Sequence, residues 1–270
     1  MPFSSYETLP HADPSFPIIF HLDQLTRLGG GVAAHWHESI ELLYCISGTA
    51  RITADMETQS MCAGEISVIN SGTLHYITIE PGCDCQYYCL IVDPSLLSEV
   101  PLENRVFQKQ ISDPAVQTYY RQIIEEMEKK PPCYKEAVKN WTQLLFIELY
   151  RRYSSQNHLE SSTHQPEMVK KAILYLRENF RDSVTIDEVC SHAGFSKYYF
   201  CRVFKKVTGR SVMEYVNYLR CAHARRLLES GGCNISECAF QSGFSDISYF
   251  TKVFKKQTGF LPSQIKKRSF

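Results

Sequence analysis

The sequence predicts a two-domain α+β protein, in which a β-barrel or jelly roll with a helical hairpin precedes an all-α double helix-turn-helix region. Three observations support this prediction. Short runs of alternating apolar and polar residues recur through the first 100 residues, with turn residues between them. Helical periodicity replaces this alternation over residues 113–153, and a segment near the C-terminus is written twice. The first pattern is typical of barrels and double sheets, and the other two indicate helices.

Five short runs in the first 100 residues fit β-strands, because side chains in a strand alternate between its two faces. The expected strands are residues 40–46, 50–54, 65–69, 76–79 and 87–92. The expected turns are Ser47-Gly48, Ala63-Gly64, Ser71-Gly72 and Pro81-Gly82. Short strands at this even spacing predict a barrel or a double-sheet jelly roll.

Three histidines and one glutamate form a candidate ligand set in this region. His35, His37 and Glu41 are in phase along one expected strand, since side chains repeat every two residues, and His75 is expected on a neighbouring strand. Three imidazoles and one carboxylate suit Zn, Fe, Mn or Ni, so a divalent metal is one candidate cofactor. Alternatively, the four residues rim a pocket for an organic ligand. Trp36 then belongs either to the core or to that pocket, as a platform for a sugar face.

Two helical segments follow the strand region. The apolar stripe of the first is Val116, Tyr119, Tyr120, Ile123, Ile124 and Met127, and the second contains Trp141, Leu144, Leu145, Glu148 and Leu149. Pro131-Pro132 separates them, which predicts a helical hairpin, and packing against the barrel is one role expected of it. Residues 154–165 are polar and lack an apolar period, as a linker does. The expected organisation is a domain over 1–153, a linker over 154–165 and a second domain over 166–270.

The repeated segment covers residues 195–209 and 244–259. Both copies begin with Phe-Ser and end with Val-Phe-Lys-Lys-x-Thr-Gly. Two copies are too few for a solenoid, which needs at least three stacked repeats. They indicate two similar structural modules that perform the same function at two adjacent positions.

A short helix is expected before each copy. Thr185 and Glu188 precede the first copy, and Asn234 and Glu237 precede the second, with the spacing of a capping box. A glycine then ends each short helix, and Ser or Asp at the start of each copy can cap a second helix. Each module is therefore predicted to be a helix-turn-helix, whose second helix enters the major groove of DNA.

The second helix of each module has an apolar face and a polar face. The residues expected to pack inward are Phe200, Val203 and Phe204 in the first copy and Phe250, Val253 and Phe254 in the second. The residues expected on the outward face are Tyr198, Cys201, Arg202 and Lys205 in the first copy and Ser248, Thr251, Lys252 and Lys255 in the second. The outward faces are candidate DNA-binding surfaces, and the alternative is a solvated basic face.

Charge separates the two halves of a chain that is neutral overall. Residues 166–270 contain 18 Lys and Arg against 9 Asp and Glu, whereas residues 1–165 contain 11 against 20. A basic second half favours double-stranded DNA as a partner, because phosphate neutralisation dominates such binding. The acidic first half is expected to stay away from phosphates.

Two motifs in the basic half are specific. They are Ser211-x3-Tyr215-Val216-x3-Arg220-x3-Ala224-x2-Leu227-Leu228 and Gly243-Phe244-Ser245-Asp246-x2-Tyr249-Phe250-x3-Phe254-Lys255. With them, residues from about 168 to 267 resemble the DNA-binding domain of AraC/XylS-type transcriptional regulators. The resemblance implies a long helix over 212–230 between two helix-turn-helix units, RNA polymerase as a partner, and a homodimer formed through the hairpin. It also implies base contacts in both outward faces and phosphate contacts by Lys205 and Lys255. Because Cys201 is a poor hydrogen-bonding group, Arg202 is expected to carry most of the first module's specificity.

The first half carries a second resemblance. Its motifs are Gly29-x5-His35-x-His37-x3-Glu41-x6-Gly48 and Gly64-x7-Gly72-x2-His75. They resemble the two cupin motifs, except that Asn70 stands at the usual proline place and Ile79 at the usual asparagine place. Sensor cupins of AraC-type regulators often keep a His-Trp-His run without using it for metal. The resemblance therefore favours the organic-ligand pocket over the metal site.

Several classes of protein are disfavoured by what the sequence lacks. It has no basic region followed by an apolar run at its start and no 18-residue apolar stretch, so we expect a cytoplasmic protein without a membrane span. Eleven cysteines without a CxxC motif argue against a disulfide framework or zinc finger. The Cys83-x-Cys85-x3-Cys89 cluster is a candidate sensor of oxidants or soft metals, although such cysteines are more often inert.

The sequence as a whole predicts a transcriptional regulator, and an activator in particular. A small-molecule effector, for which a carbohydrate is the first candidate class, is expected to bind the cupin-like half and alter DNA binding by the other half. Two alternatives stay open. One is a cupin oxygenase or isomerase with an attached DNA-binding domain, although we expect no enzyme. The other is a constitutive DNA-binding protein whose cupin-like half only dimerises.

Overall fold

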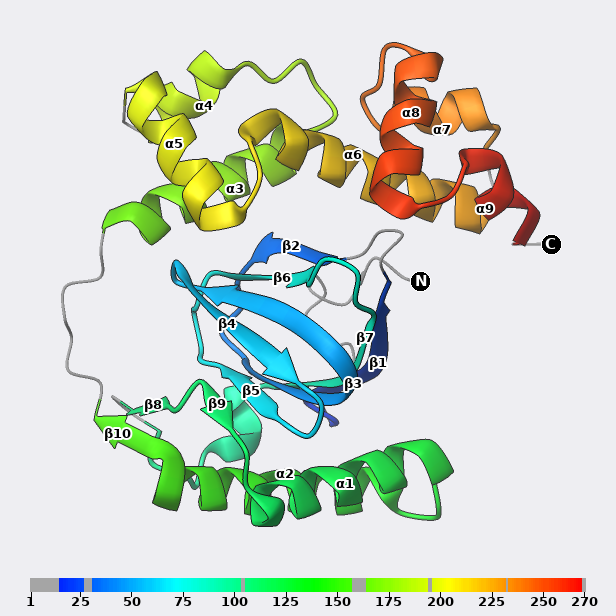
Figure 1. The fold of residues 1–270 in the computed structure, drawn as a ribbon. Helices are drawn as coiled ribbons and strands as arrows, with labels where there is room; N and C mark the ends of the chain where they lie inside the picture. The colour runs from blue at the N-terminus through cyan, green and yellow to red at the C-terminus, as the bar shows by residue number, and fades with distance from the viewer. Residues whose placement is uncertain are drawn as a thin grey trace. The chain divides into compact units, whose positions relative to one another are not determined.

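The computed structural model describes residues 15–26, 31–102, 105–156, 164–193, 196–231 and 233–268 (Figure 1). The chain divides into two compact units, one of Met1–Arg27 with Trp36–Ser161 and the other of Leu28–His35 with Ser162–Phe270. The predicted α+β architecture is confirmed, since a sheet-rich part precedes a helical part. Among the described residues, no helix combines the length and the apolar composition needed to cross a membrane.

One eight-stranded sheet dominates the first half of the chain. Its strands are β1 (Ile18–Leu25), β2 (Gly31–His35), β3 (Ile40–Ala54), β4 (Glu57–Cys62), β5 (Ile66–Ile69), β6 (His75–Ile79), β7 (Cys85–Val92) and β9 (Gln110–Ile111). They follow the order β1-β7-β3-β5-β9, while β4 and β6 pair with β3, and β2 pairs with β6. The long strand β3 organises the sheet, because its first half pairs antiparallel with β5 and β7 and its second half with β4 and β6.

Strand β3 corrects one prediction. The sequence predicts two strands with a turn at Ser47-Gly48, but the structure has one strand with a bulge between Cys45 and Ser47. Gly48 has a φ of 77°, and a Cβ atom there would lie 1.7 Å from the carbonyl oxygen of Asp84. The glycine therefore allows two backbones to approach closely inside the sheet, instead of forming a hairpin turn.

The predicted helical hairpin consists of α1 (Pro114–Lys129) and α2 (Tyr134–Tyr153). The side chain of Asp113 caps α1 by accepting a hydrogen bond from the backbone N–H of Ala115. Apolar residues of both helices share one core with the sheet, among them Val116, Ile123, Leu145, Phe146 and Leu149 from the hairpin and Leu42, Val68 and Leu90 from the strands. The buried Tyr120 hydroxyl donates to the carbonyl oxygen of Leu42 at 2.9 Å. The hairpin therefore packs against the sheet, which was one of its two predicted roles.

The segment after the hairpin begins with a strand where the sequence predicts a linker. Strand β10 (Ser154–Gln156) pairs antiparallel with β8 (Arg105–Phe107), which follows the 3-10 helix η2 (Pro94–Leu97). Backbone pairing does not depend on an apolar side-chain period, so composition alone could not show this strand. Residues 157–163 of the predicted linker lie outside the described residues.

Seven helices are described in the second half of the chain. They are α3 (His164–Asn179), α4 (Ile186–Ala193), α5 (Lys197–Thr208), α6 (Val212–Ser230), α7 (Ile235–Gln241), α8 (Ile247–Thr258) and α9 (Pro262–Arg268). The pairs α4–α5 and α7–α8 are the two predicted helix-turn-helix modules, with α6 between them (Figure 1). Phe200, Phe204, Phe250 and Phe254 are buried as predicted, and Val253 is partly buried.

Local capping explains where these helices begin. Thr185 and Glu188 exchange hydrogen bonds at the start of α4, and Asn234 with Glu237 forms a complete capping box before α7. Asp246, instead of Ser245, caps α8. The predicted glycine end of the first short helix, Gly194, lies outside the described residues.

Gly243, in the turn of the second module, has a φ of 87°, and a Cβ atom there would lie 2.6 Å from the carbonyl oxygen of Arg181. The turn therefore needs glycine both for its left-handed backbone and for a close backbone contact.

One disulfide joins Cys233 to Cys238, although the cysteine pattern gave no reason to expect a disulfide. Cys233 lies directly before the N-cap Asn234, and Cys238 lies in the first turns of α7. Helix formation brings the two Cα atoms to 5.9 Å, within the usual range for such a bond.

Candidate functional site

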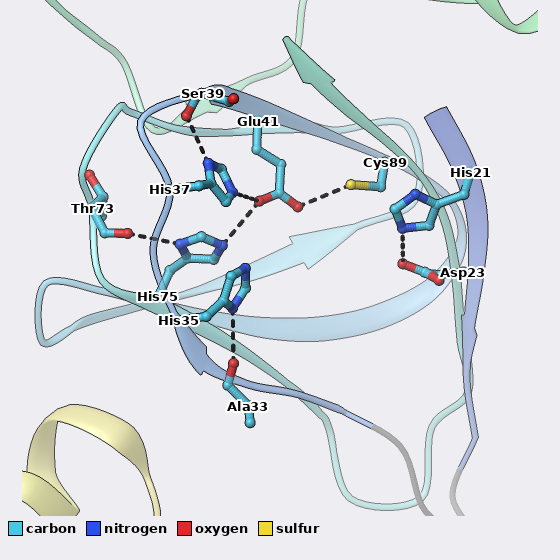
Figure 2. A network of polar contacts seen from close by, with 10 residues as sticks. All are labelled: His21, Asp23, Ala33, His35, His37, Ser39, Glu41, Thr73, His75 and Cys89. Carbon is cyan, nitrogen blue, oxygen red and sulfur yellow. Dashed lines mark hydrogen bonds and ion pairs between the residues drawn. The ribbon is translucent and has the colours of Figure 1, made fainter. Parts of the chain in front are cut away.

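Three histidines and one glutamate converge in the sheet, as Figure 2 shows. His35 ends β2, Glu41 is the second residue of β3, and His75 begins β6. One potential ligand atom from each of His35, His37, Glu41 and His75 lies within 4.8 Å of all the others. The structure thus brings together all four residues of the ligand set proposed from the sequence.

His37 reaches this set from a loop. The sequence predicts that His35, His37 and Glu41 share one strand, but β2 ends at His35 and β3 begins only at Ile40. The Nδ1 atom of His37 lies 2.9 Å from the carbonyl oxygen of Ser39, a contact that fixes the ring across the loop. Loop geometry, and not strand phase, therefore aligns His37 with the others.

A backbone carbonyl group holds each imidazole ring through its Nδ1 atom. The acceptors are Ala33 for His35, Ser39 for His37 and Thr73 for His75, each at 2.9 Å. A carbonyl oxygen can only accept, so Nδ1 carries the hydrogen in all three rings. In consequence, Nε2 is the atom through which the rings of His37 and His75 interact with Glu41. Oε2 of Glu41 lies 3.2 Å from Nε2 of His37 and 3.0 Å from Nε2 of His75.

Glu41 is the electrostatic centre of the set. It is 4% exposed, and His75 is fully buried. Burial opposes ionisation of Glu41, but the hydrogen bonds and charges of His37 and His75 hold its pKa well below the ordinary value. Burial also opposes charging of His37, yet the hydrogen bond and charge of Glu41 raise the pKa of His37. The site is therefore built to keep a carboxylate ionised in the interior of the sheet.

The sequence did not identify Cys89 as a member of this site. Its thiol donates to Oε1 of Glu41 at 3.1 Å. Within the predicted cluster of Cys83, Cys85 and Cys89, the sulfur of Cys85 lies 3.7 Å from that of Cys45, which the sequence did not include in the cluster. The sequence signal that could have drawn attention to Cys89 is the two-residue period of a strand. This period puts Cys85, Tyr87 and Cys89 on one face of β7.

Trp36 is partly buried in the loop that also carries His37. Indole offers only an N–H donor and therefore cannot be a metal ligand. Of the five residues proposed from the sequence for ligand binding, Trp36 is thus the one outside the convergent set.

Helix α5 presents the first predicted DNA-binding face. Tyr198 is 82% exposed, Arg202 and Lys205 are exposed, and Cys201 is partly buried. The guanidinium of Arg202 lies 6.0 Å from the ring centre of Tyr199, so an aromatic neighbour accompanies the proposed base-reading side chain.

Helix α8 presents the second face. Ser248, Lys252 and Lys255 are exposed, and Thr251 is partly buried. The hydroxyl of Thr251 donates to the carbonyl oxygen of Ile247 at 2.9 Å, which leaves its methyl group and lone pairs for a ligand. The half-exposed Tyr249, which the sequence did not single out as a contact, accepts a hydrogen bond from Asn217 at 2.9 Å beside this face.

Two family models match the chain. A model described as an AraC-like ligand binding domain matches residues 29–145, and one described as a helix-turn-helix domain matches residues 189–268. The first match contains the histidine and glutamate set, and the second contains both predicted recognition helices, α5 and α8.

Two curated relatives are described as an HTH-type transcriptional regulator and an HTH-type transcriptional activator. The uncharacterized HTH-type transcriptional regulator YdeC of Bacillus subtilis (strain 168) is 22% identical over 277 residues, which cover 97% of this chain and 95% of that protein. The HTH-type transcriptional activator RhaR of Escherichia coli O139:H28 is 27% identical over 147 residues, which cover 53% of this chain and 52% of RhaR. The match therefore spans about half the length of RhaR.

A solved structure shares the fold over most of the chain. The crystal structure of an apo ToxT variant from Vibrio cholerae strain SCE256 has a TM-score of 0.52 and 13% sequence identity, and covers 94% of this chain and 98% of ToxT. At this identity the likeness concerns the fold alone. The two domain matches, in this order along one chain, together with regulators among its relatives, confirm the resemblance found in the sequence: the protein belongs to the AraC family of transcriptional regulators, with an AraC-like ligand-binding domain and a helix-turn-helix DNA-binding domain.

Proposed function

We propose that this regulator is a transcriptional activator that reads DNA with α5 and α8 and responds to a small molecule bound in its first half. The observation that carries the proposal is the pair of matching outward faces on these two helices, each rich in exposed polar and basic side chains. Exposure to solvent would explain a polar and basic face on one helix. It does not explain why the same face recurs in both copies of a duplicated module.

The connector between the modules supports simultaneous reading of two grooves. Helix α6 has 19 residues, which corresponds to about 28 Å at 1.5 Å per residue. Successive major-groove faces on one side of B-DNA are roughly 34 Å apart. Capping by Ser211 and Glu214 fixes the start of this helix, and Gly231 in the left-handed region fixes its end. A helix so defined makes a rigid spacer between the modules.

The two faces divide into base-reading and phosphate-binding positions. We propose base contacts by Tyr198, Cys201 and Arg202 on α5 and by Ser248, Thr251 and Lys252 on α8. Lys205 and Lys255 lie one turn further along their helices and are proposed to contact phosphates. Arginine can bind guanine through two hydrogen bonds, so Arg202 is the strongest candidate for specificity.

Activation is the direction of regulation that we propose, because RhaR is described as an activator. We further propose RNA polymerase as a partner, because an activator acts on it, and the cytoplasm as the compartment of this chain. We also propose a homodimer through the outer face of the hairpin, where Leu144 is 43% exposed while the inner face is covered by the sheet. A Leu144→Asp variant should then be monomeric by light scattering at concentrations at which the unaltered chain is dimeric.

The effector is proposed to bind in the AraC-like ligand-binding domain, beside His35, Trp36, His37, Glu41 and His75. That the effector is a carbohydrate stays a prediction. We assign no catalytic role to this half, since the curated relatives are described as regulators. Multiple turnover of a substrate by the purified chain would contradict this assignment.

The decisive experiment is selection of DNA by the purified full chain from a random library, followed by sequencing. We expect an enriched motif with two half-sites about one helical turn apart. A variant that lacks both Arg202 and Lys252 should lose this motif. A Lys171→Ala control, which removes one exposed basic side chain from α3, should retain it. Enrichment of no motif by the unaltered chain would overturn the proposal.

A further inference from the structure

We propose that Cys45 and Cys85 form a reversible oxidation site, at which a hydroperoxide converts two thiols into one disulfide. The site lies in the first compact unit, and the proposal does not depend on the effector or on the DNA contacts proposed above. The sequence grouped Cys85 with Cys83 and Cys89. The structure supplies a different partner, because Cys45 of β3 lies beside Cys85 of β7.

The two sulfur atoms are already in contact. Sγ of Cys45 lies 3.7 Å from Sγ of Cys85, and both cysteines are free. A disulfide bond is about 2.0 Å long, so oxidation requires the sulfur atoms to approach from 3.7 Å by about 1.7 Å. Rotation about the two Cα–Cβ bonds, with a small shift of the backbone, supplies a movement of this size. No distant segment of the chain has to be brought in.

The backbone around the pair holds the two cysteines together and still allows a small shift. Pairing of β3 with β7 passes from Cys45 directly to Ser47, so Ile46 is the extra residue of a bulge. A bulge interrupts the ladder and bends the strand. Further along, Gly48 pairs with Cys85, and a Cβ atom at Gly48 would lie 3.0 Å from Cα of Cys85. The strands are therefore packed closely at Gly48 and adjustable at the bulge.

The pair lies directly beneath the surface, although Cys45 is 0% exposed and Cys85 is 1% exposed. Residues 46–48, which follow Cys45, are exposed, and so is Asp84, which precedes Cys85. Exposed segments of a sheet open locally at a much smaller cost in free energy than the core. Such an opening is enough to admit hydrogen peroxide, which is only slightly larger than water. A small oxidant can therefore reach the pair without unfolding of the sheet.

The two thiols differ in their tendency to ionise, and this difference assigns the nucleophile. The hydrogen bond from Cys85 lowers the pKa of Cys45 below its ordinary value, against the opposing effect of burial. The same hydrogen bond, together with burial and the charge of Cys45, raises the pKa of Cys85. The thiolate, and not the thiol, is the nucleophilic form of cysteine. Cys45 is therefore the attacking residue, and Cys85 keeps its proton until the second step.

The oxidation takes place in two balanced steps. In the first, the thiolate of Cys45 attacks the hydroxyl oxygen of the hydroperoxide, so that a sulfur–oxygen bond forms and the oxygen–oxygen bond breaks. The leaving oxygen takes up the proton that Cys45 released on ionisation. The peroxide is thereby reduced to water or an alcohol, and Cys45 becomes a sulfenic acid. In the second step, the sulfur of Cys85 loses its proton and attacks the sulfur of Cys45, and the hydroxyl group leaves with that proton as water.

Oxidation of Cys45 also prepares Cys85 for the second step. The negative charge of Cys45 is one cause of the raised pKa of Cys85, and a sulfenic acid is neutral. The first step therefore removes that charge, and Cys85 ionises more easily. A sulfenic acid beside a second thiol condenses to a disulfide, and thiol reductants restore both thiols. The pair thus has a nucleophile and a resolving thiol, the two parts that a reversible response to oxidants needs.

The test uses the full chain, first reduced and then separated from the reductant. After treatment with hydrogen peroxide, the remaining thiols are blocked with iodoacetamide, and the digested chain is analysed by mass spectrometry. We expect a peptide of β3 joined to a peptide of β7 through Cys45 and Cys85, with the loss of two hydrogen atoms. Dithiothreitol should separate the two peptides again. The yield should be the same in dilute and in concentrated protein, because both thiols belong to one chain.

Three variants test the assigned roles. Cys85→Ser should stop at the sulfenic acid of Cys45, which dimedone labels. Cys45→Ser removes the nucleophile, so Cys85 should stay reduced at the same peroxide concentration. Cys133→Ser is the matched control, because Cys133 is exposed and lies outside β3 and β7. This control should form the link between Cys45 and Cys85 to the same extent as the unaltered chain.

The result for the unaltered chain is decisive whether or not the variants fold. Absence of the link, under conditions in which peroxide oxidises the exposed Cys62, would overturn the proposal. A disulfide between Cys85 and Cys83 in its place, or oxidation of Cys45 that dithiothreitol does not reverse, would overturn it as well. DNA selection by the reduced chain is measured separately, so failure of one proposal does not count against the other.

Discussion

The thiol of Cys89 lies 3.1 Å from Oε1 of Glu41, although 48 residues separate them in the chain. Cys89 lies on β7 opposite Leu43 of β3, so pairing of these two strands creates the contact. The thiol occupies one carboxylate oxygen and leaves the other facing the histidines. Cys89 is therefore a positioning residue for Glu41.

For a metal ion held by the four-residue set that the sequence predicts, replacement of Cys89 by alanine should weaken binding without removing a ligand. Loss of a partner behind a metal ligand typically costs about 10–100-fold in affinity. Competition between Co²⁺ and a chromophoric chelator measures the change. Cys62→Ala is the control, because Cys62 is exposed on β4. Equal affinity for both variants would show that Cys89 does not position Glu41.

Arg202→Ala should relax DNA specificity. We expect a loss of about 1–3 kcal/mol at the preferred sequence and a smaller loss on unrelated DNA, because a base contact is removed. Fluorescence anisotropy with both DNAs measures the two losses. If the variant keeps the full sequence preference, the outward face of α5 does not read bases as proposed.

Lys255→Ala should weaken binding to all DNA sequences alike, since a phosphate contact carries no sequence information. The slope of log affinity against log salt should fall by about 1, because one fewer counterion is released. Lys171→Ala removes the same charge from the exposed surface of α3. An identical change in slope for this control would show that Lys255 acts only through the overall charge of the protein, and not through a phosphate contact.

Gly48→Ala should destabilise the sheet far more than Gly64→Ala. Both glycines have positive φ, 77° and 87°, so each substitution introduces left-handed strain of roughly 1–2 kcal/mol. A Cβ atom at Gly48 would also lie 1.7 Å from the backbone oxygen of Asp84, whereas nothing lies within 4 Å at Gly64. The total loss for Gly48→Ala should therefore exceed about 4 kcal/mol.

Urea unfolding followed by tryptophan fluorescence measures this difference, because Trp36 and Trp141 both belong to the first compact unit. The signal is then insensitive to the helix-turn-helix half. Similar midpoints for the two glycine variants would show that the strands around Gly48 separate easily to admit a side chain.

The sequence by itself determined the features that depend on near neighbours in the chain. The capping box of Ser211 with Glu214 and the glycine at 231 define α6 as Val212–Ser230, the range predicted for the connector. The duplicated segment and its capping residues likewise predicted α5 and α8. These signals act over three or four residues, so a sequence pattern displays them directly.

Tertiary structure alone decided how the sheet assembles its site. His75 reaches Glu41 across 34 positions, although strand pairing puts it opposite Ala54 at the far end of β3. Pairing of β3 with β7 brings Cys89 to Glu41 across 48 positions. Neither contact follows from a local pattern. The same limit explains the error at Gly48, where a glycine that looks like a turn allows a close backbone contact with Asp84. Residue types could propose the three histidines and the glutamate, but only the tertiary fold of the sheet and its loops makes them neighbours.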